Sequence, residues 1–514
     1  MFIHYAVIAV YLTLLALLMV YCIHRYYILF LYLRHKNKLP CGESLPENLP
    51  RVTVQLPLYN EMYVVQRLLN AVAKLEYPKE CLEVQVLDDS TDETSRLALE
   101  YCARLKEQGY TITYLHRRER HGFKAGALQA GLEVAGGELI AIFDADFIPG
   151  KDFLLKMIPY FSGPKVGMVQ SRWGHINRNY SLLTKLQSIF LDAHFMLEHT
   201  ARNRSGRFFN FNGTAGIWRK VCILSAGGWH HDTLTEDLDL SYRAQLKGWK
   251  FIFVPEVVTP AEIPVDMDSF KSQQHRWAKG GIETAKKLLP AILKSPLPLK
   301  IKIESLYHLT SNLNYLLILL LSLCAYPALV IRIAMGWRNL LLFDLIFFLG
   351  ATLPVGLYYL LSQREVQEPY LQKIVYLPFL MALGIGLCVN NGWGVIEALL
   401  GYTSEFLRTP KFRIEGTSDK WKHKKYRGYT RTVSTLFELA LGCYFLSAVL
   451  FAIRFKVYAS IPFLMLFCGG FFYVSLLSLF QKCTLREMKN LSKILIHRWW
   501  EIAPVSSNSI EGGK

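Results

Sequence analysis

Long apolar runs frame a central region in which short apolar and polar segments alternate. The first run covers about residues 5–33, and later runs lie at about 306–332, 339–362, 373–392, 434–455 and 459–480. Each is near the ~20 residues that an α-helix needs to cross the hydrocarbon of a bilayer. The first run lacks a preceding basic segment and a small-residue cleavage site. It therefore predicts a retained transmembrane helix over residues 1–34 rather than a signal peptide.

The apolar pattern of residues 51–268 is typical of an α/β domain. Helical patterns at 62–74 and 91–107 separate runs with a strand-like pattern, which lie at 52–56, 84–87, 112–115 and 139–143. Such alternation favours a doubly wound domain with a parallel sheet. Ligands of these sheets bind at the carboxyl ends of the strands, where Asp88, Asp89, Asp144 and Asp146 fall.

The second half of the chain is predicted to lie mainly in a membrane. Its expected segments are interfacial helices at 269–302, transmembrane helices at 303–402 and 432–481, a cytoplasmic loop at 403–431 and a cytoplasmic tail at 482–514. The basic stretch 411–431 should share the cytoplasmic side of the α/β domain, but three apolar runs separate them. Either 306–332, with Pro327, is re-entrant, or the Gly-rich and Asn-rich stretch 373–402 dips in and returns. The polar end from Pro504 to Lys514 is predicted to be disordered.

Composition supports a membrane location. The 514 residues are 52% hydrophobic, the net charge is +17, and the mean hydropathy is +0.20. The basic residues are scattered beside apolar helices, which disfavours a nucleic-acid partner. The ten cysteines include no Cys-x-x-Cys pair, so they predict neither a zinc site nor a disulfide framework. We expect a multi-pass protein of the cell inner or plasma membrane with a cytoplasmic catalytic domain.

Two acidic motifs follow predicted strands. Asp144-Ala145-Asp146 comes directly after five apolar residues, so both carboxylates can face one ion. Hard cations such as Mg²⁺ or Mn²⁺ prefer oxygen ligands, and no His or Cys accompanies the pair to favour zinc. The alternative is an ordinary turn or cap. Near Asp88 and Asp89, Ser90 or Thr91 could cap the following helix.

Other polar groups complete a candidate site. Lys124 precedes small residues at a helix start, which favours a diphosphate clamp. The segment 211–216, with Gly213 and Thr214, would let an acceptor sugar approach the backbone. Asp237 suits a general base, although Thr235 and the acids after it could simply cap a helix.

Gln273, Arg276 and Trp277 form the most specific motif. On a helix they share one face, because they lie at positions i, i+3 and i+4. Arg276 can pair with a diphosphate, and the Trp277 ring can stack on a sugar. A lone tryptophan would more simply anchor the chain at a membrane surface.

In order and spacing, these motifs resemble the processive enzymes of glycosyltransferase family 2 over about residues 51–411. The chain is most similar to the cellulose-synthase-like glucomannan and glucan synthases. The resemblance implies a GT-A-like, nucleotide-sugar-binding catalytic domain in which Asp237 is the base. It also implies that Asp144 and Asp146 bind the metal, and that acceptor contacts come from Gly213, Thr214, Glu236 and Trp277. The implied donor-binding residues are Pro57, Tyr59, Glu61, Asp88, Asp89, Lys124, Asp144, Gln273, Arg276, Thr409 and Lys411.

The stretch 406–411 resembles the gating-loop pattern of processive synthases, Phe-x-Val-Thr-x-Lys, but Arg408 replaces the valine. Such a loop can close over a bound nucleotide. A basic membrane anchor is the alternative. The Arg-x-x-x-Arg spacing of Arg427 and Arg431 occurs in cyclic-di-GMP-binding arms, but no partner motif follows it, so no such domain is expected.

The expected function is therefore an inverting membrane glycosyltransferase. It would use GDP-mannose or UDP-glucose to polymerise a β-linked mannan, glucomannan or glucan and to translocate the product. One alternative is a lipid glycosyltransferase of the ceramide or diacylglycerol type. A transporter with a regulatory domain is disfavoured, because Asp344 and Glu438 stand alone in their apolar runs.

Overall fold

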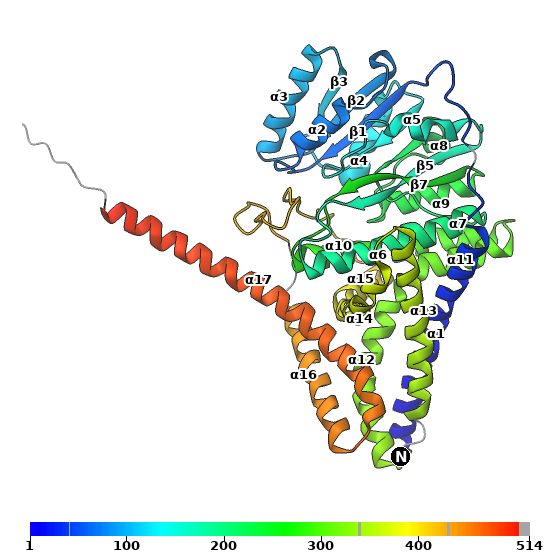
Figure 1. The fold of residues 1–514 in the computed structure, drawn as a ribbon, viewed down its shortest axis with the longest axis vertical. Helices are drawn as coiled ribbons and strands as arrows, with labels where there is room; N and C mark the ends of the chain where they lie inside the picture. Colours follow the sequence, from blue (N-terminus) through cyan, green and yellow to red (C-terminus); the bar gives the residue numbers. More distant parts are fainter. Residues whose placement is uncertain (41, 338–340, 429–431, 503–514) are drawn as a thin grey trace, which may run out of the picture.

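In the computed structural model, the chain forms a mixed α/β domain above a bundle of long helices (Figure 1). The structure describes residues 1–40, 42–337, 341–428 and 432–502, without the side chains at 341–343, 345, 348, 370 and 484–502. The predicted tail from Pro504 to Lys514 therefore lies outside the described residues, as does Arg431.

The α/β domain is built on one sheet, which has seven strands in the described part of the chain in the order β3-β2-β1-β4-β6-β5-β7. The strands are β1 (Val52–Leu58), β2 (Leu82–Asp88), β3 (Thr111–His116), β4 (Leu139–Ile142), β5 (Val166–His175), β6 (Gly216–Arg219) and β7 (Lys250–Ala261). The four predicted strands, β1 to β4, are parallel. Strand β6 runs antiparallel to β4 and β5, so the prediction of a parallel sheet is wrong for β6 and the sheet is mixed.

Both faces of the sheet carry an apolar core, because successive strand residues point to opposite faces. In β4, Leu139 and Ala141 belong to one core, and Ile140 and Ile142 belong to the other. The first core is covered by α2 (Val65–Ala73), α3 (Glu93–Glu107) and α5 (Phe153–Met157). The second is covered by α4 (Phe123–Val134), α8 (Lys220–Ser225) and α9 (Glu236–Leu246). The doubly wound arrangement is confirmed.

Helix α3 is capped by Asp92, whose carboxylate accepts a hydrogen bond from the Thr94 backbone N–H at 2.9 Å. The interpretation of Ser90 or Thr91 as the cap is therefore wrong. Ser90 Oγ instead accepts a hydrogen bond from the Asn60 backbone N–H at 2.8 Å. This contact ties the loops after β1 and β2 together at one edge of the sheet.

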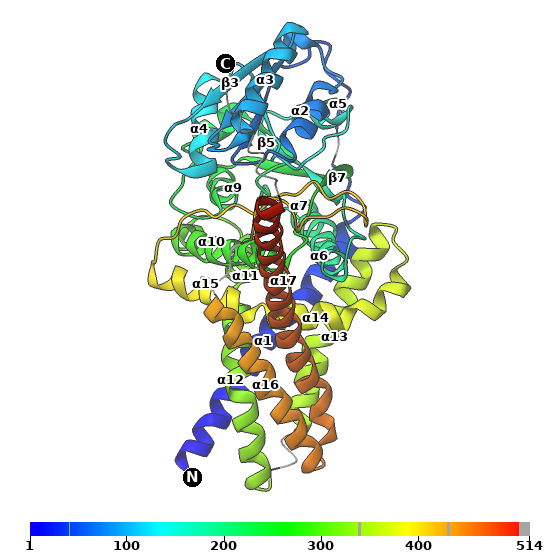
Figure 2. The same cartoon turned by 90° about the vertical axis from the view of Figure 1, so that its left-hand side faces the viewer.

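A layer of helices separates the sheet from the long bundle (Figures 1 and 2). It contains α6 (Leu182–Ala193), the π-helix η3 (His194–His199), α7 (Thr200–Arg204), α10 (Met267–Lys294) and α11 (Leu299–Thr310). Helix α10 begins two residues before the predicted segment 269–302, because the Asp266 carboxylate caps it by accepting from the Ser269 N–H. Short 3-10 helices are η1 (Lys79–Cys81), η2 (Ile158–Phe161), η5 (Tyr370–Tyr376) and η6 (Tyr458–Ser460).

The bundle consists of α1 (Phe2–His35), α12 (Leu313–Ala334), α13 (Leu341–Glu365), α16 (Thr432–Arg454) and α17 (Ile461–Ile502). Within the described residues, four stretches are long and apolar enough to cross a membrane, at Phe2–His35, Leu313–Ala334, Thr432–Arg454 and Tyr458–Cys483. A fifth arises if the bent pair of α14 (Leu377–Gly386) and α15 (Cys388–Leu400) counts as one span. Helix α12 continues through Pro327, so the re-entrant interpretation of 306–332 is wrong.

Buried ion pairs link the long helices. Arg332 of α12 contacts Asp344 of α13 at 2.8 Å, and Lys271 of α10 contacts Glu438 of α16 at 2.7 Å. The view that Asp344 and Glu438 stand alone is therefore wrong, and it no longer counts against a transporter. Asp344 pairs with the preceding helix and Glu438 with a helix distant in sequence, and the hydropathy pattern reveals neither pair.

Candidate active site

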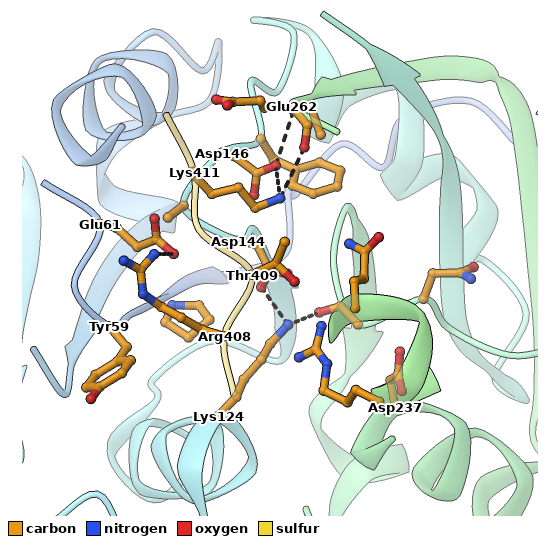
Figure 3. A pocket seen from close by; sticks show the side chains of 18 of the residues that line it. Tyr59, Glu61, Lys124, Asp144, Asp146, Asp237, Glu262, Arg408, Thr409 and Lys411 are labelled. Carbon is orange, nitrogen blue, oxygen red and sulfur yellow. Dashed lines mark hydrogen bonds and ion pairs between the residues drawn. The ribbon is translucent and has the colours of Figure 1, made fainter. Parts of the chain in front are cut away.

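A cavity of about 170 Å³ lies at the edge of the sheet where β1, β2 and β4 end (Figure 3). It is lined by most of the predicted site residues: Pro57, Tyr59, Glu61, Asp89, Lys124, Asp144, Asp146, Gly213, Glu236, Asp237, Gln273, Arg276, Trp277, Thr409 and Lys411. Asp88 and Thr214, also predicted, do not line it. The fold thus brings together groups that are spread over more than 350 residues of the sequence.

Asp88 and Asp89 occupy different environments. Asp88 is fully buried and accepts hydrogen bonds from the Tyr114 hydroxyl at 2.7 Å and the Ser90 N–H at 3.0 Å. Burial alone would raise the pKa of Asp88, but these hydrogen bonds lower it. Asp89 lines the cavity, where Arg117 donates two hydrogen bonds to its carboxylate at 2.7 and 2.6 Å. Asp88 does not line the cavity, so its predicted role in donor binding stays a prediction.

Aromatic rings and a guanidinium group gather at the outer side of the cavity. The Arg120 guanidinium carbon lies 3.5 Å from the centre of the Tyr59 ring and 4.9 Å from that of Phe123. Phe406 stacks on Phe123 with 6.0 Å between ring centres. These flat groups offer stacking surfaces for a nucleobase.

Lys124 connects two predicted parts of the site. Its ammonium donates to Asp144 Oδ1 at 2.5 Å and to the Gly213 carbonyl at 2.9 Å. Burial lowers the pKa of Lys124, but the carboxylates of Asp144, Glu236 and Asp237 together outweigh burial and raise it. Thr214 lies behind this contact, where its Oγ1 accepts from the Asp144 N–H at 2.8 Å. Thr214 therefore orients Asp144 instead of lining the cavity.

Asp146 faces a second ammonium group. Lys411 Nζ lies 2.8 Å from Asp146 Oδ2 and also donates to the Glu262 carbonyl at 3.1 Å. The Glu262 backbone N–H donates to the same carboxylate oxygen at 3.2 Å. Burial opposes the charge on the amine, but Asp146 raises the pKa of Lys411. The loop 406–411 is thus fastened to the end of the sheet (Figure 3).

The carboxylates at this edge fit the predicted divalent cation. Asp144, Asp146, Glu61 and Glu262 offer only oxygen donors, which hard cations prefer. Among the described side chains, Glu61 Oε2 and Glu262 Oε2 are buried without a hydrogen-bond partner. Ammonium groups already lie against Asp144 and Asp146, so positive charge is favourable at this edge.

Asp237 lies in the first turn of α9. Thr235 holds the capping position, but its side chain makes no capping hydrogen bond and contacts Thr284 Oγ1 at 3.2 Å instead. Asp237 Oδ1 accepts from the Leu238 N–H at 2.8 Å. Burial, and after it the adjacent Glu236 carboxylate, raise the pKa of Asp237 to about 7. A carboxylate with this pKa is well matched to proton abstraction near neutral pH.

Helix α10 presents its predicted motif as one face. Gln273, Arg276 and Trp277 all line the cavity, which confirms the expected sharing of a helix face. The Arg276 guanidinium carbon lies 4.2 Å from the centre of the Phe406 ring. Arg276 therefore reaches the loop 406–411, and Trp277 faces the interior instead of standing only at a membrane surface.

Arg408 holds the loop 406–411 in place. Its guanidinium lies 3.0 Å from Glu61 Oε1, and its Cζ lies 4.0 Å from the centre of the Tyr426 ring. Burial raises the pKa of Glu61 to about 8 although Arg408 opposes this shift. The residue that departs from the gating-loop pattern thus joins the loop to the strand end after β1.

A second cavity, of about 510 Å³, extends between the helices of the bundle. Its lining comes from α1, α6, α12, α13, α14 and α17 among others and is mainly apolar. Six residues line both cavities: Trp173, Leu191, Asn212, Thr235, Asp237 and Trp277. The candidate base and the tryptophan of α10 therefore stand where the two cavities adjoin.

Sequence reasoning missed two residues of the site. Glu262 directly follows β7, and Trp173 lies in β5, neither of which was predicted. An acid directly after a strand is the signal that identified Asp144, and it would have identified Glu262. Prolines at 255 and 260 conceal β7, because proline removes a backbone donor.

Comparisons with known proteins agree with this geometry. Residues 50–280 match the family model for "Glycosyltransferase like family 2". A probable glucomannan 4-beta-mannosyltransferase 7 from Oryza sativa subsp. japonica is 45% identical over 249 residues, 48% of this chain and 43% of its own length. Glucomannan 4-beta-mannosyltransferase 1 from Cyamopsis tetragonoloba is 44% identical over 48% of this chain and 47% of its own. The chain spans about half the length of the curated relatives it matches.

A solved structure has a similar fold. It is a mannosyltransferase from Pyrobaculum calidifontis in complex with GDP-Man and Mn²⁺, with a TM-score of 0.54 and 21% identity. The match covers 77% of this chain and all of the other. Residues 50–280 thus match the glycosyltransferase family 2 model and fold as a GT-A-like mixed sheet, in a chain similar to the cellulose-synthase-like glucomannan mannosyltransferases.

Proposed function

We propose that this protein is an inverting membrane hexosyltransferase that extends a β-linked polysaccharide from a nucleotide-activated hexose. GDP-mannose is the first candidate donor, since the similar curated proteins are named glucomannan mannosyltransferases, and UDP-glucose is the second. One observation carries the proposal. Asp237, with its raised pKa, lies between a cavity with paired acids and basic groups and a second cavity among the long helices.

Asp237 acts as the general base. It removes the proton of an acceptor hydroxyl, whose oxygen then attacks the anomeric carbon while the nucleoside diphosphate leaves. A single displacement of this kind inverts the configuration at the anomeric carbon. Lys124 and Arg276 bring positive charge to the cavity, where they would stabilise the leaving diphosphate.

Asp144 and Asp146 would hold Mg²⁺ or Mn²⁺. A bound cation of this kind supplies Lewis-acid stabilisation to the leaving diphosphate. Asp89, Tyr59 and Pro57 would bind the nucleoside, since they line the same cavity. The loop with Thr409 and Lys411 would close over the nucleotide, and Arg408 with Glu61 would fasten the closed loop.

The acceptor chain would leave through the second cavity. Trp277 lines both cavities, so a sugar ring stacked on the indole would place its terminal hydroxyl near Asp237. Gly213 and Glu236 line the first cavity beside this path. The lining of the second cavity by side chains of α1, α12 and α13 supports the passage of a polymer between the long helices.

We infer a membrane topology from the course of the chain. In Figure 1, α12 leads away from the α/β domain, α13 returns, and α14 and α15 lie across the near end of the bundle. This arrangement supports a bent 373–402 segment that dips in and returns, which would place residues 403–428 on the side of the α/β domain. The basic residues of that loop favour the cytoplasmic side.

A lipid acceptor is the second candidate. The second cavity is lined by many apolar side chains, such as Leu15, Ile318, Phe347, Leu380 and Phe467. An acyl chain would bury well against this surface. The two candidates differ in their product, because a lipid glycoside carries one sugar and partitions into organic solvent.

Labelled donors with purified protein test the proposal. The parent should transfer hexose from GDP-mannose or UDP-glucose, whereas Asp237→Asn should lose at least ~100-fold of the transfer rate and still bind nucleotide. Asp232→Asn is the matched control, since Asp232 is an exposed acid outside both cavities that pairs with Lys287. Near-normal transfer by Asp237→Asn would reject the base. Release of free hexose without transfer to any acceptor would reject the transferase.

A further inference from the structure

The π-helix η3 brings two histidines to one face of the helical run between α6 and α7. In an α-helix, with about 3.6 residues per turn, residues five apart point to different faces. The wider winding of a π-helix places them together, and such segments concentrate at functional sites. The rings of His194 and His199 accordingly lie 4.4 Å apart between their centres.

Both rings bind one side chain, Asn212. His199 Nε2 lies 2.5 Å from Asn212 Oδ1, and Asn212 Nδ2 lies 3.0 Å from His194 Nε2. An amide oxygen only accepts and an amide NH₂ only donates, so His199 carries its proton on Nε2 and His194 Nε2 is unprotonated. His194 then donates from Nδ1 to Glu198 Oε2, at 3.0 Å. The hydrogen bonds form one continuous chain.

The surroundings of His199 favour the neutral ring that this chain requires. Its side chain is fully buried, and the rings of Phe195, Phe209 and Phe253 lie 5.2 to 5.3 Å away. Burial holds the pKa of His199 well below its ordinary value. The imidazole therefore acts as a fixed donor to Asn212.

Asn212 precedes the residue that links the two sides of the active site. Its backbone N–H donates to Gln170 Oε1 at 3.1 Å, so its main chain is also fixed. The next carbonyl, that of Gly213, accepts from Lys124 at 2.9 Å. A Cβ atom at Gly213 would lie 3.0 Å from Asp237 Oδ2. A shift of Asn212 would therefore move the Lys124 contact and crowd or release the candidate base.

We propose that His194 and His199 are positioning residues that clamp the side chain of Asn212. The clamp holds Gly213, Lys124 and Asp237 at the relative positions that glycosyl transfer needs. This inference rests on the proposed function. It extends the machinery to the π-helix, which touches neither the nucleotide side of the cavity nor the paired acids. His194 also lines the second cavity, so the clamp stands beside the path of the acceptor.

Three variants test the clamp. His199→Leu removes the donor, and His199→Gln restores an N–H near the position of Nε2. Asn203→Leu is the matched control, because the Asn203 amide also makes two hydrogen bonds, to Phe251 O and from the Phe253 N–H, but lines neither cavity. We expect His199→Leu to lower kcat at least ~10-fold with the nucleotide Kd within about twofold. His199→Gln should recover most of kcat, and Asn203→Leu should lower Tm without changing kcat.

Equal losses of kcat in His199→Leu and Asn203→Leu, or no recovery in His199→Gln, would overturn the positioning role. A second test measures thermal unfolding and does not depend on enzymatic activity. The combined Tm shift of the double variant with His199→Leu and Asn212→Leu should be smaller than the sum of the two single shifts, because both substitutions remove the same hydrogen bond. Additive shifts for this pair would overturn the clamp. Coupled shifts in a parent that transfers no hexose would instead contradict the proposed function alone.

Discussion

Gly213 stands between the candidate base and the lysine that meets Asp144. Its φ of +80° is a conformation that favours glycine, and a Cβ there would lie 3.0 Å from Asp237 Oδ2 and 3.4 Å from Lys124 Nζ. At the scale of single residues, the geometry of the site therefore requires a residue without a side chain at position 213, as well as the charged residues around it.

Gly213→Ala should lower both Tm and kcat, because the methyl group strains the backbone and crowds Asp237. Gly248→Ala is the control. Gly248 has a φ of +86°, and a Cβ there would meet no atom within 4 Å. The control should share the loss of Tm, measured by thermal unfolding, and keep its kcat. Equal kcat in the two variants would show that crowding at Gly213 is unimportant.

The raised pKa of Asp237 predicts two dependences on pH. Transfer should fall as pH drops below about 7, because the base becomes protonated. Between the ordinary carboxyl pKa and about 7, the folded state binds a proton that the unfolded state has lost, so this group lowers stability as pH rises. Asp237→Asn should therefore raise Tm clearly at pH 8 and less at pH 5. A flat rate profile from pH 5.5 to 8, with equal Tm gains, would contradict the raised pKa.

Single site residues could be predicted from the sequence where they belong to a short motif with a fixed order and spacing. Asp144, Asp237 and Arg276 belong to such motifs, and all three line one cavity. The contact of Asn212 with His194 could not be predicted, because it depends on the π-helical winding of a segment that reads as an ordinary helix. The burial of Asp88 could not be predicted either, because the Tyr114 hydroxyl that donates to its carboxylate comes from the neighbouring strand.

At the scale of elements, α10 presents Trp277, the proposed platform for the acceptor sugar, to the cavity. Trp277→Ala should leave insertion and nucleotide binding intact and abolish elongation, since the ring would no longer position a sugar beside Asp237. Trp393→Ala is the control, because Trp393 is 49% exposed on α15 and lines neither cavity. Polymer length and amount, measured by size exclusion, should fall only in the first variant. Product of normal length from Trp277→Ala would assign that ring to membrane anchoring.

Elements with a regular period could be predicted, and irregular ones could not. Strands β1 to β4 show uninterrupted apolar runs and were predicted. In β5, polar and glycine residues follow the apolar start, and β7 contains Pro255 and Pro260. Both strands contribute to the site, and Glu262 directly follows β7. The sequence analysis therefore missed one of the acids at this edge of the sheet.

At the scale of the whole molecule, the helical bundle places the loop 403–428 and the turn between α16 and α17 at opposite ends (Figures 1 and 2). Hydropathy predicted the long helices but not whether an odd or even number of membrane crossings separates the α/β domain from the loop that begins at residue 403. Parity depends on how 373–402 bends against α10 and α17, which is a matter of tertiary packing. Close approach of Gly386 to Gly470, where a Cβ would meet a carbonyl oxygen at 2.4 Å, fixes that packing.

Labelling from outside the cell tests this topology. In Lys456→Cys, the new thiol lies in the turn before α17 and should react with a membrane-impermeant maleimide in intact cells. In Lys420→Cys, it lies in the loop 403–431 and should react only after the membrane is opened. Reaction of both thiols from the same side would contradict the proposed crossings.

The central proposal is that a sugar added beside Asp237 enters a path for a growing chain. It rests on the two adjoining cavities, because Asp237 lines both of them. The most direct measurement sizes the product that purified protein makes from labelled GDP-mannose or UDP-glucose with Mn²⁺. We expect a long, water-phase polymer that a β-mannanase or β-glucanase degrades and that Asp237→Asn does not make. A product with a single labelled sugar that partitions into organic solvent, or no incorporation from either donor, would contradict the proposal.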